Sequence, residues 1–527
     1  MFKILISDKL GNAGLEILDQ ADGVTYDMIT GLSKEELLAK IPEYDALIIR
    51  SGTKADADVI GAGTNLKVIG RAGIGVDNVD IRAATMRGII VMNTPTGNSV
   101  ATAEQALTLM MAASRNTAQA HASLGAGEWN RSQFAGVELF QKTLGIIGFG
   151  NIGRLVAKRA QGFEMDVIAY DPFISEEVGR ELGVTLVDLD DLLAQSDYIT
   201  LHTALVDATR NIINADTIAQ MKDGVIFINA ARGKMVDEDA LAAGLKSGKI
   251  RAAGLDVYQQ EPPVGSPLIG LPNVVHVPHL GASTAEASRN VAIQIAEQVI
   301  DALKGTDFRN ALNMPFPAGP GFNKIRPYMD LGEKLGLLQH YLADGKINCV
   351  EIEVLGEEAD DLIRPVAAGV LKGALEKAID GEVNYINAPV LAEENGITTS
   401  QSKEMSDIDY HNLITCKAKW DGGENIISGV LVGGKQPRLV KVNEYHLEAK
   451  PEGFVLILQN QDVPGVIGQV GTILSAYEVN IGEWRMGRNT PGGEALSFIN
   501  LDSEPVDDVL KALGKIPAIT QVKLISL

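Results

Sequence analysis

Three polar residues with complementary chemistry, Arg232, Glu261 and His279, each fall in a loop that follows a predicted strand of one α/β unit. Histidine, with an ordinary pKa of about 6.5, can take up or release a proton near neutral pH. A neighbouring carboxylate raises that pKa and orients the ring, and Glu261 can do this for His279. An arginine can bind a carboxylate with two parallel hydrogen bonds and polarise the adjacent carbonyl. The set predicts hydride transfer between NAD and the hydroxyl of a small carboxylic acid, with His279 taking the hydroxyl proton.

A fourth residue, His202, competes with His279 for the role of base. It also lies near the end of a predicted strand, Tyr198–Thr203, but no acidic side chain stands close to it in the sequence. A lone histidine after a strand is more often structural. Arginine, glutamate and histidine together at the strand ends of one sheet favour a catalytic set. We therefore predict that Arg232, Glu261 and His279 are the catalytic residues.

The stretch Thr143–Asp171 predicts the binding of a dinucleotide. An apolar run is typical of a buried strand and leads into a G-x-G-x-x-G pattern made by Gly148, Gly150 and Gly153. The first glycine permits a tight turn, the second lets the backbone approach a pyrophosphate, and the third lets the next helix pack closely on the strand. The helix N-terminus then faces the phosphate charge. Asp171 ends the following strand, 21 residues after Gly150, where a carboxylate can bind a ribose 2′-OH and repel a 2′-phosphate, so NAD is predicted rather than NADP.

Two arginines at strand ends nearer the N-terminus, Arg50 and Arg71, predict an anion site. Arg50 follows the apolar run ALII, and Arg71 opens the loop RAGIGVDN after the next strand. Loops at the carboxyl ends of strands are where open α/β sheets bind ligands. Capping or surface arginines remain an equally good interpretation from the spacing alone.

Alternating strands and helices organise the elements that position these residues. Residues 1–95 carry predicted strands at 2–7, 46–50, 67–70 and 89–92, and about six more strands fall between 97 and 282. A long helix, Thr284–Leu303, leaves the second unit. The fold class predicted is α/β, with two doubly wound, Rossmann-like units, the second inserted into the first.

The rest of the chain predicts two α+β units. Proline and glycine cluster at 310–320 and mark a linker. Residues 321–450 mix strands and helices without a chemical motif, although the turn 433–441 is locally basic and is either a solvated turn or an anion site. Residues 453–527 follow the order β-α-β-β-α-β, which is the ferredoxin-like arrangement.

Composition excludes several classes of function. A net charge of −22 argues against nucleic acid and against an anionic membrane surface as partners. The two cysteines, Cys349 and Cys416, form no disulfide framework and lack metal-ligand spacing, so no metal is expected. No signal-peptide pattern opens the chain and no apolar run approaches 18 residues, which favours a soluble cytoplasmic protein.

With these motifs in place, the chain resembles the D-isomer specific 2-hydroxyacid dehydrogenase family, and within it the long phosphoglycerate dehydrogenases. The resemblance covers essentially all of residues 1–527. It implies a discontinuous substrate-binding domain (1–96 and 283–316), an NAD-binding domain (97–282), an intervening domain (317–450) and a C-terminal regulatory ACT domain (453–527). The stretches that carry it are GRAGIGVDNVD (70–80), NTPTGNS (93–99), TLGIIGFGNIGR (143–154), INAARGKMVDEDAL (228–241), LDVYQQEPP (255–263) and PHLGAST (278–284).

The resemblance also implies roles for single residues. It implies that Arg232 binds the substrate carboxylate and that the pair of His279 and Glu261 performs acid–base catalysis. The implied NAD contacts, beyond the glycines and Asp171, are Asn151, Ile152, Thr203, Ala230, Ala231, Arg232, Asp256, His279, Gly281 and Ala282. The implied substrate contacts are Arg50, Arg71, Gly73, Ile74, Asn98 and Arg131. The implied contacts of an L-serine effector are Asn460, Asp462, Asn480 and Ile481.

The activity implied is the oxidation of 3-phospho-D-glycerate to 3-phosphooxypyruvate, the entry step to L-serine, with feedback by serine and with reduction of 2-oxoglutarate as a further activity. Two alternatives stay open at this point. One is a dehydrogenase for glycerate, lactate or 2-hydroxyglutarate, because sequence does not separate carboxylate from phosphate. The other is an NAD-sensing binding protein, because corepressor relatives keep the same arginine, glutamate and histidine. The long region 97–140 favours at least a dimer, and we expect a homodimer or homotetramer.

Overall fold

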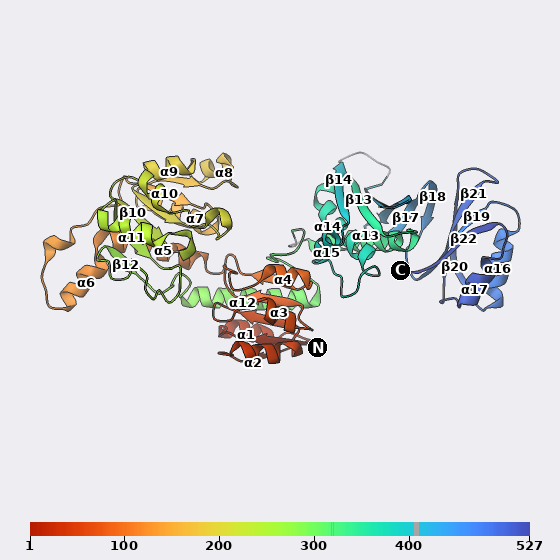
Figure 1. Cartoon of the computed structure of the whole chain (residues 1–527), viewed down its shortest axis with the longest axis horizontal. Helices are drawn as coiled ribbons and strands as arrows, with labels where there is room; N and C mark the ends of the chain where they lie inside the picture. Colours follow the sequence, from red (N-terminus) through yellow and green to blue (C-terminus); the bar gives the residue numbers. More distant parts are fainter. Residues whose placement is uncertain (318, 320, 405–409) are drawn as a thin grey trace.

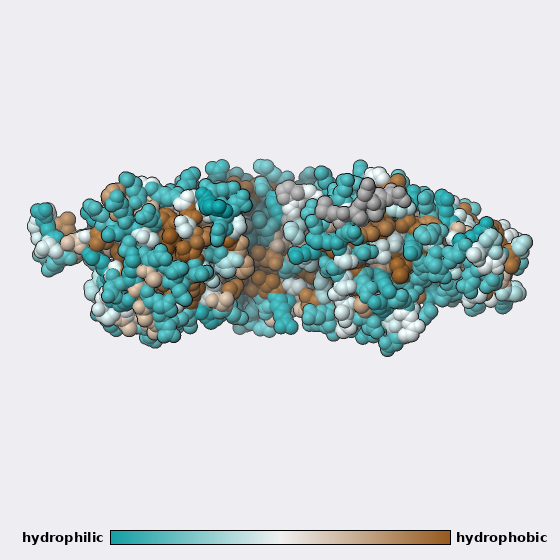
Figure 2. Space-filling view, turned by 90° about the horizontal axis from the view of Figure 1, so that it is seen from above, coloured by the Kyte–Doolittle hydropathy of each residue, from teal (hydrophilic) through white to brown (hydrophobic). Residues whose placement is uncertain are grey.

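The described residues of this computed structural model are 1–317, 319, 321–404 and 410–527, and they form four β-sheets along an elongated molecule (Figure 1). Two positions of the predicted linker, 318 and 320, and residues 405–409 of the predicted third unit lie outside the described residues. On the face drawn in Figure 2 the surface is mostly hydrophilic, and apolar residues show mainly in the hollows.

The first sheet is parallel, with strand order β2-β1-β3-β4-β5. Its strands are β1 (Phe2–Ile6), β2 (Val24–Met28), β3 (Ala46–Ile49), β4 (Val68–Arg71) and β5 (Ile90–Asn93). Successive residues of one strand enter different cores: Ile4 packs with the long helix α12 (Ala285–Lys304), and Leu5 packs on the opposite face. A parallel sheet covered on both faces explains why these strands are apolar throughout.

Helices cover both faces of this sheet. One face carries α12 and α1, and the other carries α2 and α3. The sequence does not predict β2, because its side chains are mostly half-exposed at a sheet edge. The helices between the strands are α1 (Asn12–Asp19), α2 (Lys34–Lys40), α3 (Ala57–Ala62) and α4 (Ile81–Met86).

The second sheet is also parallel and has seven strands in the order β12-β11-β10-β9-β6-β7-β8, where the sequence predicts about six. The additional strand, β8, has only two residues. The strand order reverses between β6 and β9, and such a reversal opens a crevice at the carboxyl ends of the strands. The strands are β6 (Thr143–Ile147), β7 (Asp166–Tyr170), β8 (Thr185–Leu186), β9 (Tyr198–Leu201), β10 (Val225–Asn229), β11 (Ile250–Leu255) and β12 (Val274–His276).

Helices again cover both faces of the second sheet and form separate cores. The apolar helix α5 (Ser99–Arg115) lies with α7 on one face, and the helices α9 to α11 lie on the other. An arm made by α6 (Thr117–Gly125) and η2 (Arg131–Phe134) buries no residue of its own and projects from the body (Figure 1). The remaining helices are α7 (Asn151–Gly162), α8 (Glu176–Glu181), α9 (Leu189–Gln195), α10 (Ala215–Gln220) and α11 (Glu238–Ser247).

The third sheet, in the order β14-β13-β15-β16-β17-β18, is antiparallel except for the pair β13 and β14. Its strands are β13 (Ile347–Gly356), β14 (Thr398–Glu404), β15 (Asn412–Trp420), β16 (Gly423–Val432), β17 (Gln436–Val442) and β18 (Tyr445–Ala449). Three helices accompany it: α13 (Phe322–Leu342), α14 (Ala359–Leu375) and α15 (Ala388–Glu394). Of the locally basic stretch 433–441, only 433–435 form the turn between β16 and β17, and the rest belongs to β17.

The fourth sheet is antiparallel, in the order β20-β21-β19-β22, and its connections give the predicted β-α-β-β-α-β arrangement. Its elements are β19 (Phe454–Gln461), α16 (Val466–Ala476), β20 (Ile481–Arg488), β21 (Glu494–Leu501), α17 (Asp507–Leu513) and β22 (Ile519–Ser526). The fold class predicted from the sequence is therefore confirmed: two Rossmann-like parallel sheets are followed by two α+β units. No helix among the described residues is long and apolar enough to span a membrane.

Candidate active site

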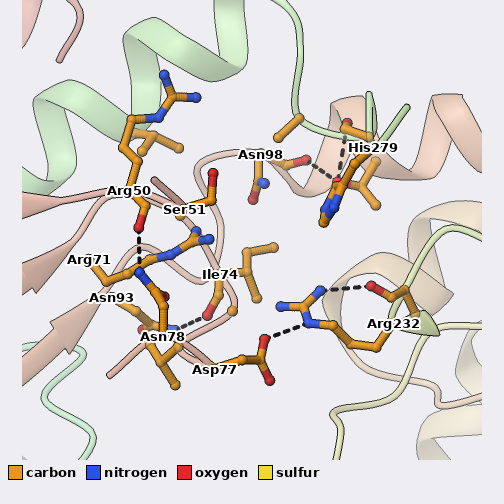
Figure 3. A pocket seen from close by; sticks show the side chains of 18 of the residues that line it. Arg50, Ser51, Arg71, Ile74, Asp77, Asn78, Asn93, Asn98, Arg232 and His279 are labelled. Carbon is orange, nitrogen blue, oxygen red and sulfur yellow. Dashed lines mark hydrogen bonds and ion pairs between the residues drawn. The ribbon is translucent and has the colours of Figure 1, made fainter. Parts of the chain in front are cut away.

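A cavity of about 1160 Å³ lies where the carboxyl ends of strands from the first two sheets face each other. Loops after β3 and β4 line one side, and loops after β9, β10, β11 and β12 line the other. Figure 3 shows Arg50 and Arg71 on one side of this space and Arg232 and His279 on the other. The cavity gathers most of the residues that the sequence singles out.

His279 and Glu261 form a hydrogen-bonded pair at this cavity, with His279 Nδ1 2.7 Å from Glu261 Oε2. The bond to Glu261 raises the pKa of the His279 imidazole, although burial acts against it. Burial acts to raise the pKa of Glu261, but the bond and charge of His279 outweigh it, so that pKa is lowered. His279 also has a φ of 54°, a conformation that non-glycine residues seldom adopt and that often marks a functional loop.

His202 is unsuited to the role of base. Burial lowers the pKa of its imidazole to about 3, and its Nε2 is hydrogen-bonded to Thr200 Oγ1 at 2.9 Å. A group that releases its proton at such a low pH is a weak base near neutrality. Of the two histidines considered from the sequence, His279 has the environment that general acid–base catalysis needs.

Arg232 follows β10 and reaches across to the first sheet. Its Nε donates to Asp77 Oδ2 at 2.8 Å, and its Nη1 donates to the carbonyl of Ala231 at 2.7 Å (Figure 3). Asp77 lies in the loop after β4, so this ion pair joins the two sheets. Asp77 is not among the residues predicted from the sequence, although it stands six residues after Arg71 in the same loop.

Arg71 presents a guanidinium whose Nε is buried and has no hydrogen-bond partner among the described residues. Burial, together with the positive charges of Arg232 and Arg50, lowers the pKa of Arg71 to about 10, although the carboxylates of Asp77 and Asp8 act against this. A cation in this position is stabilised by an anion. Arg50 lines the same cavity, and its backbone N–H donates to Asp8 at 2.6 Å.

Two glycines make room for the arginine side chains. A Cβ on Gly73, whose φ is 145°, would come within 1.7 Å of Arg71 Nη1. A Cβ on Gly75 would come within 1.5 Å of Arg232 Nη2. The loop between these glycines therefore passes directly against two guanidinium groups, and any larger residue there would displace one of them.

Each glycine of the G-x-G-x-x-G turn has a distinct surrounding. Gly148 has a φ of 96°, and a Cβ there would meet the backbone of His202 and Thr203 at 2.6 Å. A Cβ on Gly153 would lie 2.2 Å from the carbonyl oxygen of Gly148. By contrast, a Cβ on Gly150 would meet no described atom within 4 Å, and α7, which begins next to it, has no side-chain N-cap bond in the described structure. Open space beside uncapped helix N–H groups suits a phosphate.

Asp171 lies beside this turn at the end of β7, where its Oδ2 accepts a hydrogen bond from Phe149 N at 2.8 Å. Asp256 is 1% exposed, and its two carboxylate oxygens accept bonds from Leu280 N and Gly281 N at 2.6 and 2.8 Å. Asp256 thereby holds the loop that carries His279. Burial raises the pKa of Asp256.

Most of the predicted ligand contacts line this cavity, and a few do not. The lining includes Arg50, Arg71, Gly73, Ile74, Asn98, Asn151, Ile152, Thr203, Ala230, Ala231, Arg232, Asp256, Glu261, His279, Gly281 and Ala282. The residues outside the lining are Gly148, Gly150, Gly153 and Asp171, which lie in and beside the glycine-rich turn, and Arg131, which lies on the projecting arm. No group of three potential metal ligands occurs within the described ranges.

The predicted effector residues divide into two pairs. Asn460 and Asp462 line a small cavity of about 270 Å³ beside the start of α16. Asp462 Oδ2 accepts a hydrogen bond from Arg488 Nη1 at 2.6 Å, and this bond lowers the pKa of Asp462. Asn480 and Ile481 lie outside that cavity, and Asn480 donates to Asp502 at 2.6 Å.

Comparison with known families finds two matches within the chain. Residues 107–281 match the family "D-isomer specific 2-hydroxyacid dehydrogenase, NAD binding domain". Residues 324–443 match the family "D-3-phosphoglycerate dehydrogenase intervening domain". The first match holds the glycine-rich turn and all three predicted catalytic residues.

Curated relatives match the whole chain. A D-3-phosphoglycerate dehydrogenase of Methanocaldococcus jannaschii is 43% identical over 100% of both chains. Those of Synechocystis sp. (41%, 100% of this chain and 95% of the relative) and Bacillus subtilis (38%, 100% of both) are also similar. Each of these matches spans the residues of all four units of this chain.

Solved structures match the first two sheets. A protein of Thermus thermophilus has a TM-score of 0.55 at 34% identity and covers 59% of this chain and 99% of its own. A D-lactate dehydrogenase of Aquifex aeolicus complexed with NAD and lactic acid has a TM-score of 0.53 at 26% identity, over 58% of this chain and 96% of its own.

Proposed function

Because this chain belongs to the D-3-phosphoglycerate dehydrogenase family, we propose that it oxidises 3-phospho-D-glycerate to 3-phosphooxypyruvate with NAD. Membership of the wider family makes it an NAD-dependent 2-hydroxyacid dehydrogenase. The choice of a phosphorylated acid is the proposal. One observation carries it: the guanidinium of Arg71, whose Nε has no partner among the described residues, lies in the same cavity as His279 and Arg232.

The substrate has an anionic group at each end, and the cavity offers a cation for each. Arg232 binds the carboxylate through its Nη1–Nη2 edge, since Asp77 already occupies Nε. Arg71, with Arg50 near it, binds the phosphate, and Gly73, Ile74 and Asn98 contact the substrate between them. Charge-assisted, bidentate bonds are among the strongest that a protein makes to either group.

His279 removes the proton of the C2 hydroxyl, and its bond to Glu261 stabilises the imidazolium that results. NAD, when bound, would supply the acceptor for the hydride that leaves C2. The Arg232 guanidinium polarises the carbonyl that forms, because it binds the adjacent carboxylate. In the reverse direction the protonated His279 returns the proton to the carbonyl oxygen.

The chain offers residues that fit NAD. The open space at Gly150 and the first N–H groups of α7, at Asn151 and Ile152, would hold the pyrophosphate. Asp171 would hold the ribose. The other proposed contacts are Thr203, Ala230, Ala231, Arg232, Asp256, His279, Gly281 and Ala282.

The same proposal assigns a role to each domain of the chain. Residues 1–96 and 283–316 bind substrate, and 97–282 bind NAD. Residues 317–450 form the intervening domain, and 453–527 form an ACT domain that binds L-serine at Asn460 and Asp462, with Asn480 and Ile481 nearby. The reaction is then the entry to serine synthesis under feedback by serine. The exposed apolar residues Leu124 and Trp129 of the arm, 58% and 76% exposed, support a homodimer or homotetramer to which the arm of one chain contributes Arg131.

A second activity, reduction of 2-oxoglutarate to 2-hydroxyglutarate, is supported by the same pair of cations. This oxoacid also has two anionic ends, and Arg71 offers its guanidinium to a carboxylate as well as to a phosphate.

An assay of NADH formation with a panel of 2-hydroxy acids tests these proposals. We expect kcat/KM for 3-phospho-D-glycerate to exceed that for D-glycerate, D-lactate and 2-hydroxyglutarate, and serine to reduce the rate. A preference for an unphosphorylated acid would reject the substrate proposal. No activity with any of them would favour an NAD-sensing protein.

A further inference from the structure

A buried carboxylate behind the catalytic pair, Glu238, holds both ends of the loop that carries Glu261. Glu238 is the first residue of α11 and is only 9% exposed. Its Oε1 accepts a hydrogen bond from Gln259 N at 2.7 Å, and its Oε2 accepts one from Ser266 Oγ at 2.5 Å. The chain between these two anchors is largely exposed, and Glu261 lies within it.

Two further contacts hold this loop against the segment 232–238, which leads from Arg232 to Glu238. The side chain of Gln259 donates through Nε2 to the carbonyl of Val236 at 2.6 Å. A Cβ on Gly233 would lie 1.9 Å from the carbonyl carbon of Tyr258, so only glycine lets the two backbones approach this closely. Tyr258 N in turn donates to Glu261 Oε1 at 3.2 Å.

The same short segment of chain therefore positions two functional groups. It begins with Arg232 at the end of β10 and reaches Glu238 six residues later. Loops of this length and exposure are mobile unless they are anchored, and a loosely held carboxylate would leave the histidine ring unoriented. Each oxygen of the anchoring Glu238 side chain accepts one hydrogen bond from this loop.

We propose that Glu238 is a positioning residue for the proposed dehydrogenase reaction. Its carboxylate fixes the loop 259–266, and this loop holds the Glu261 carboxylate against His279. Because the segment 232–238 also carries Arg232, Glu261 and Arg232 keep a fixed position relative to each other. Glu238 does not line the cavity. This inference rests on the roles proposed for Glu261 and His279.

The test measures the protonation of His279 without substrate. The full-length protein is labelled with ¹³C-histidine, and the titration of its imidazole is followed by NMR. The signal is assigned among the seven histidines by its loss in His279→Ala. The charged groups facing His279 are Glu261, Asp256 and Arg232, and the Glu238→Ala change removes none of them.

We expect Glu238→Ala to move the His279 titration to lower pH, because the carboxylate that raises its pKa is no longer held in place. In the same variant kcat falls by about tenfold or more, and KM for the hydroxy acid changes by less than about threefold, as expected for a group that acts on the proton transfer rather than on binding. Ser266→Ala, which removes one anchor, gives a smaller shift. Glu238→Gln keeps an acceptor for Gln259 N and restores most of the titration and of kcat.

The matched control is Asp237→Ala. Asp237 caps α11 by accepting a hydrogen bond from Ala240 N at 3.1 Å, and its side chain makes no hydrogen bond to the loop within the described structure. We expect this change to lower Tm without moving the His279 titration. The inference would be overturned if Asp237→Ala and Glu238→Ala lowered Tm equally and neither change moved the titration of His279.

Two outcomes separate this inference from the proposed function. If Glu238→Ala does not fold, the His279 titrations of Ser266→Ala and Glu238→Gln test the inference instead. An unmoved titration in Ser266→Ala then counts against the positioning role. Should the unaltered protein oxidise no 2-hydroxy acid, the proposed function fails, while the titration still tests whether Glu238 holds Glu261 against His279.

Discussion

His279 combines an uncommon backbone conformation with a carboxylate partner, and both set its chemistry. The φ of 54° is held by backbone bonds from His279 N to Asp256 O and by the bonds that Asp256 accepts from the next two residues. These contacts aim the ring at the cavity, and the 2.7 Å bond to Glu261 raises its pKa. The position of one loop thus determines both where the proposed base lies and at which pH it is charged.

The pH dependence of hydroxy-acid oxidation tests this pairing. Oxidation needs neutral His279, so the rate rises as pH increases through the raised pKa of His279. The Glu261→Gln change removes the partner charge, and we expect the midpoint of the kcat/KM profile to move to lower pH. The control, His279→Ala, abolishes the transition and lowers kcat by about 10²–10⁴-fold while NAD still binds. A midpoint that stays in place in Glu261→Gln would contradict the assignment.

At the scale of elements, the strand–turn–helix β6–α7 was the most predictable part of the chain. The predicted strand, Leu144–Ile147, differs from β6 by one residue. The predicted helix, Arg154–Gly162, begins three residues later than α7, because the first turn of α7 includes the last glycine of the motif. The edge strands β2 and β8 were not predicted, since one is half-exposed and the other has two residues.

Arg232, Glu261 and His279 were found from their places after strands. Asp77 and Glu238 were not, because their partners lie 155, 21 and 28 residues away in sequence and only the fold brings them together.

Asp171, the acidic residue that follows β7, allows a prediction about the cofactor preference of this strand–turn–helix. We expect Asp171→Ala to raise kcat/KM for NADP relative to NAD by about tenfold or more, the size of one charged hydrogen bond. The matched control is Asp166→Ala at the other end of the same strand, where the side chain is exposed and far from the turn. Steady-state kinetics with both cofactors measure the ratio. A ratio that is unchanged in Asp171→Ala, or changed equally in both variants, would remove Asp171 from the cofactor site.

At the scale of the molecule, the units are joined by packed contacts rather than by free linkers. Ile386, near the start of α15, is 5% exposed and belongs to the core of the first sheet, and Asn384 Nδ2 donates to Gly88 O at 2.8 Å. The third and fourth sheets share one core, which includes Val455 and Phe498. Packed contacts therefore form a path from the C-terminal unit through the third unit to the first sheet. Figure 1 draws the C-terminal unit in blue and the first sheet in red.

This path predicts how serine would act. We expect Ile386→Ala to weaken inhibition by serine, because it removes packing between the third unit and the first sheet, while kcat without serine stays within about twofold of the unaltered enzyme. The control is Leu391→Ala on α15, which faces the core of the third unit. Inhibition curves for serine compare the two. Identical inhibition in Ile386→Ala and the unaltered enzyme would show that the signal does not use this contact.

The substrate proposal depends most directly on Arg71, and the ratio of kcat/KM for 3-phospho-D-glycerate to that for D-glycerate is the measurement that tests it. We predict that Arg71→Met lowers this ratio by about 10–100-fold, because one charge-assisted hydrogen-bonding partner of the phosphate is lost. Arg71→Lys keeps the charge but loses the planar guanidinium, so its ratio should lie between those of the unaltered enzyme and of Arg71→Met. A ratio unchanged by Arg71→Met would contradict the proposal that this guanidinium selects a phosphorylated substrate.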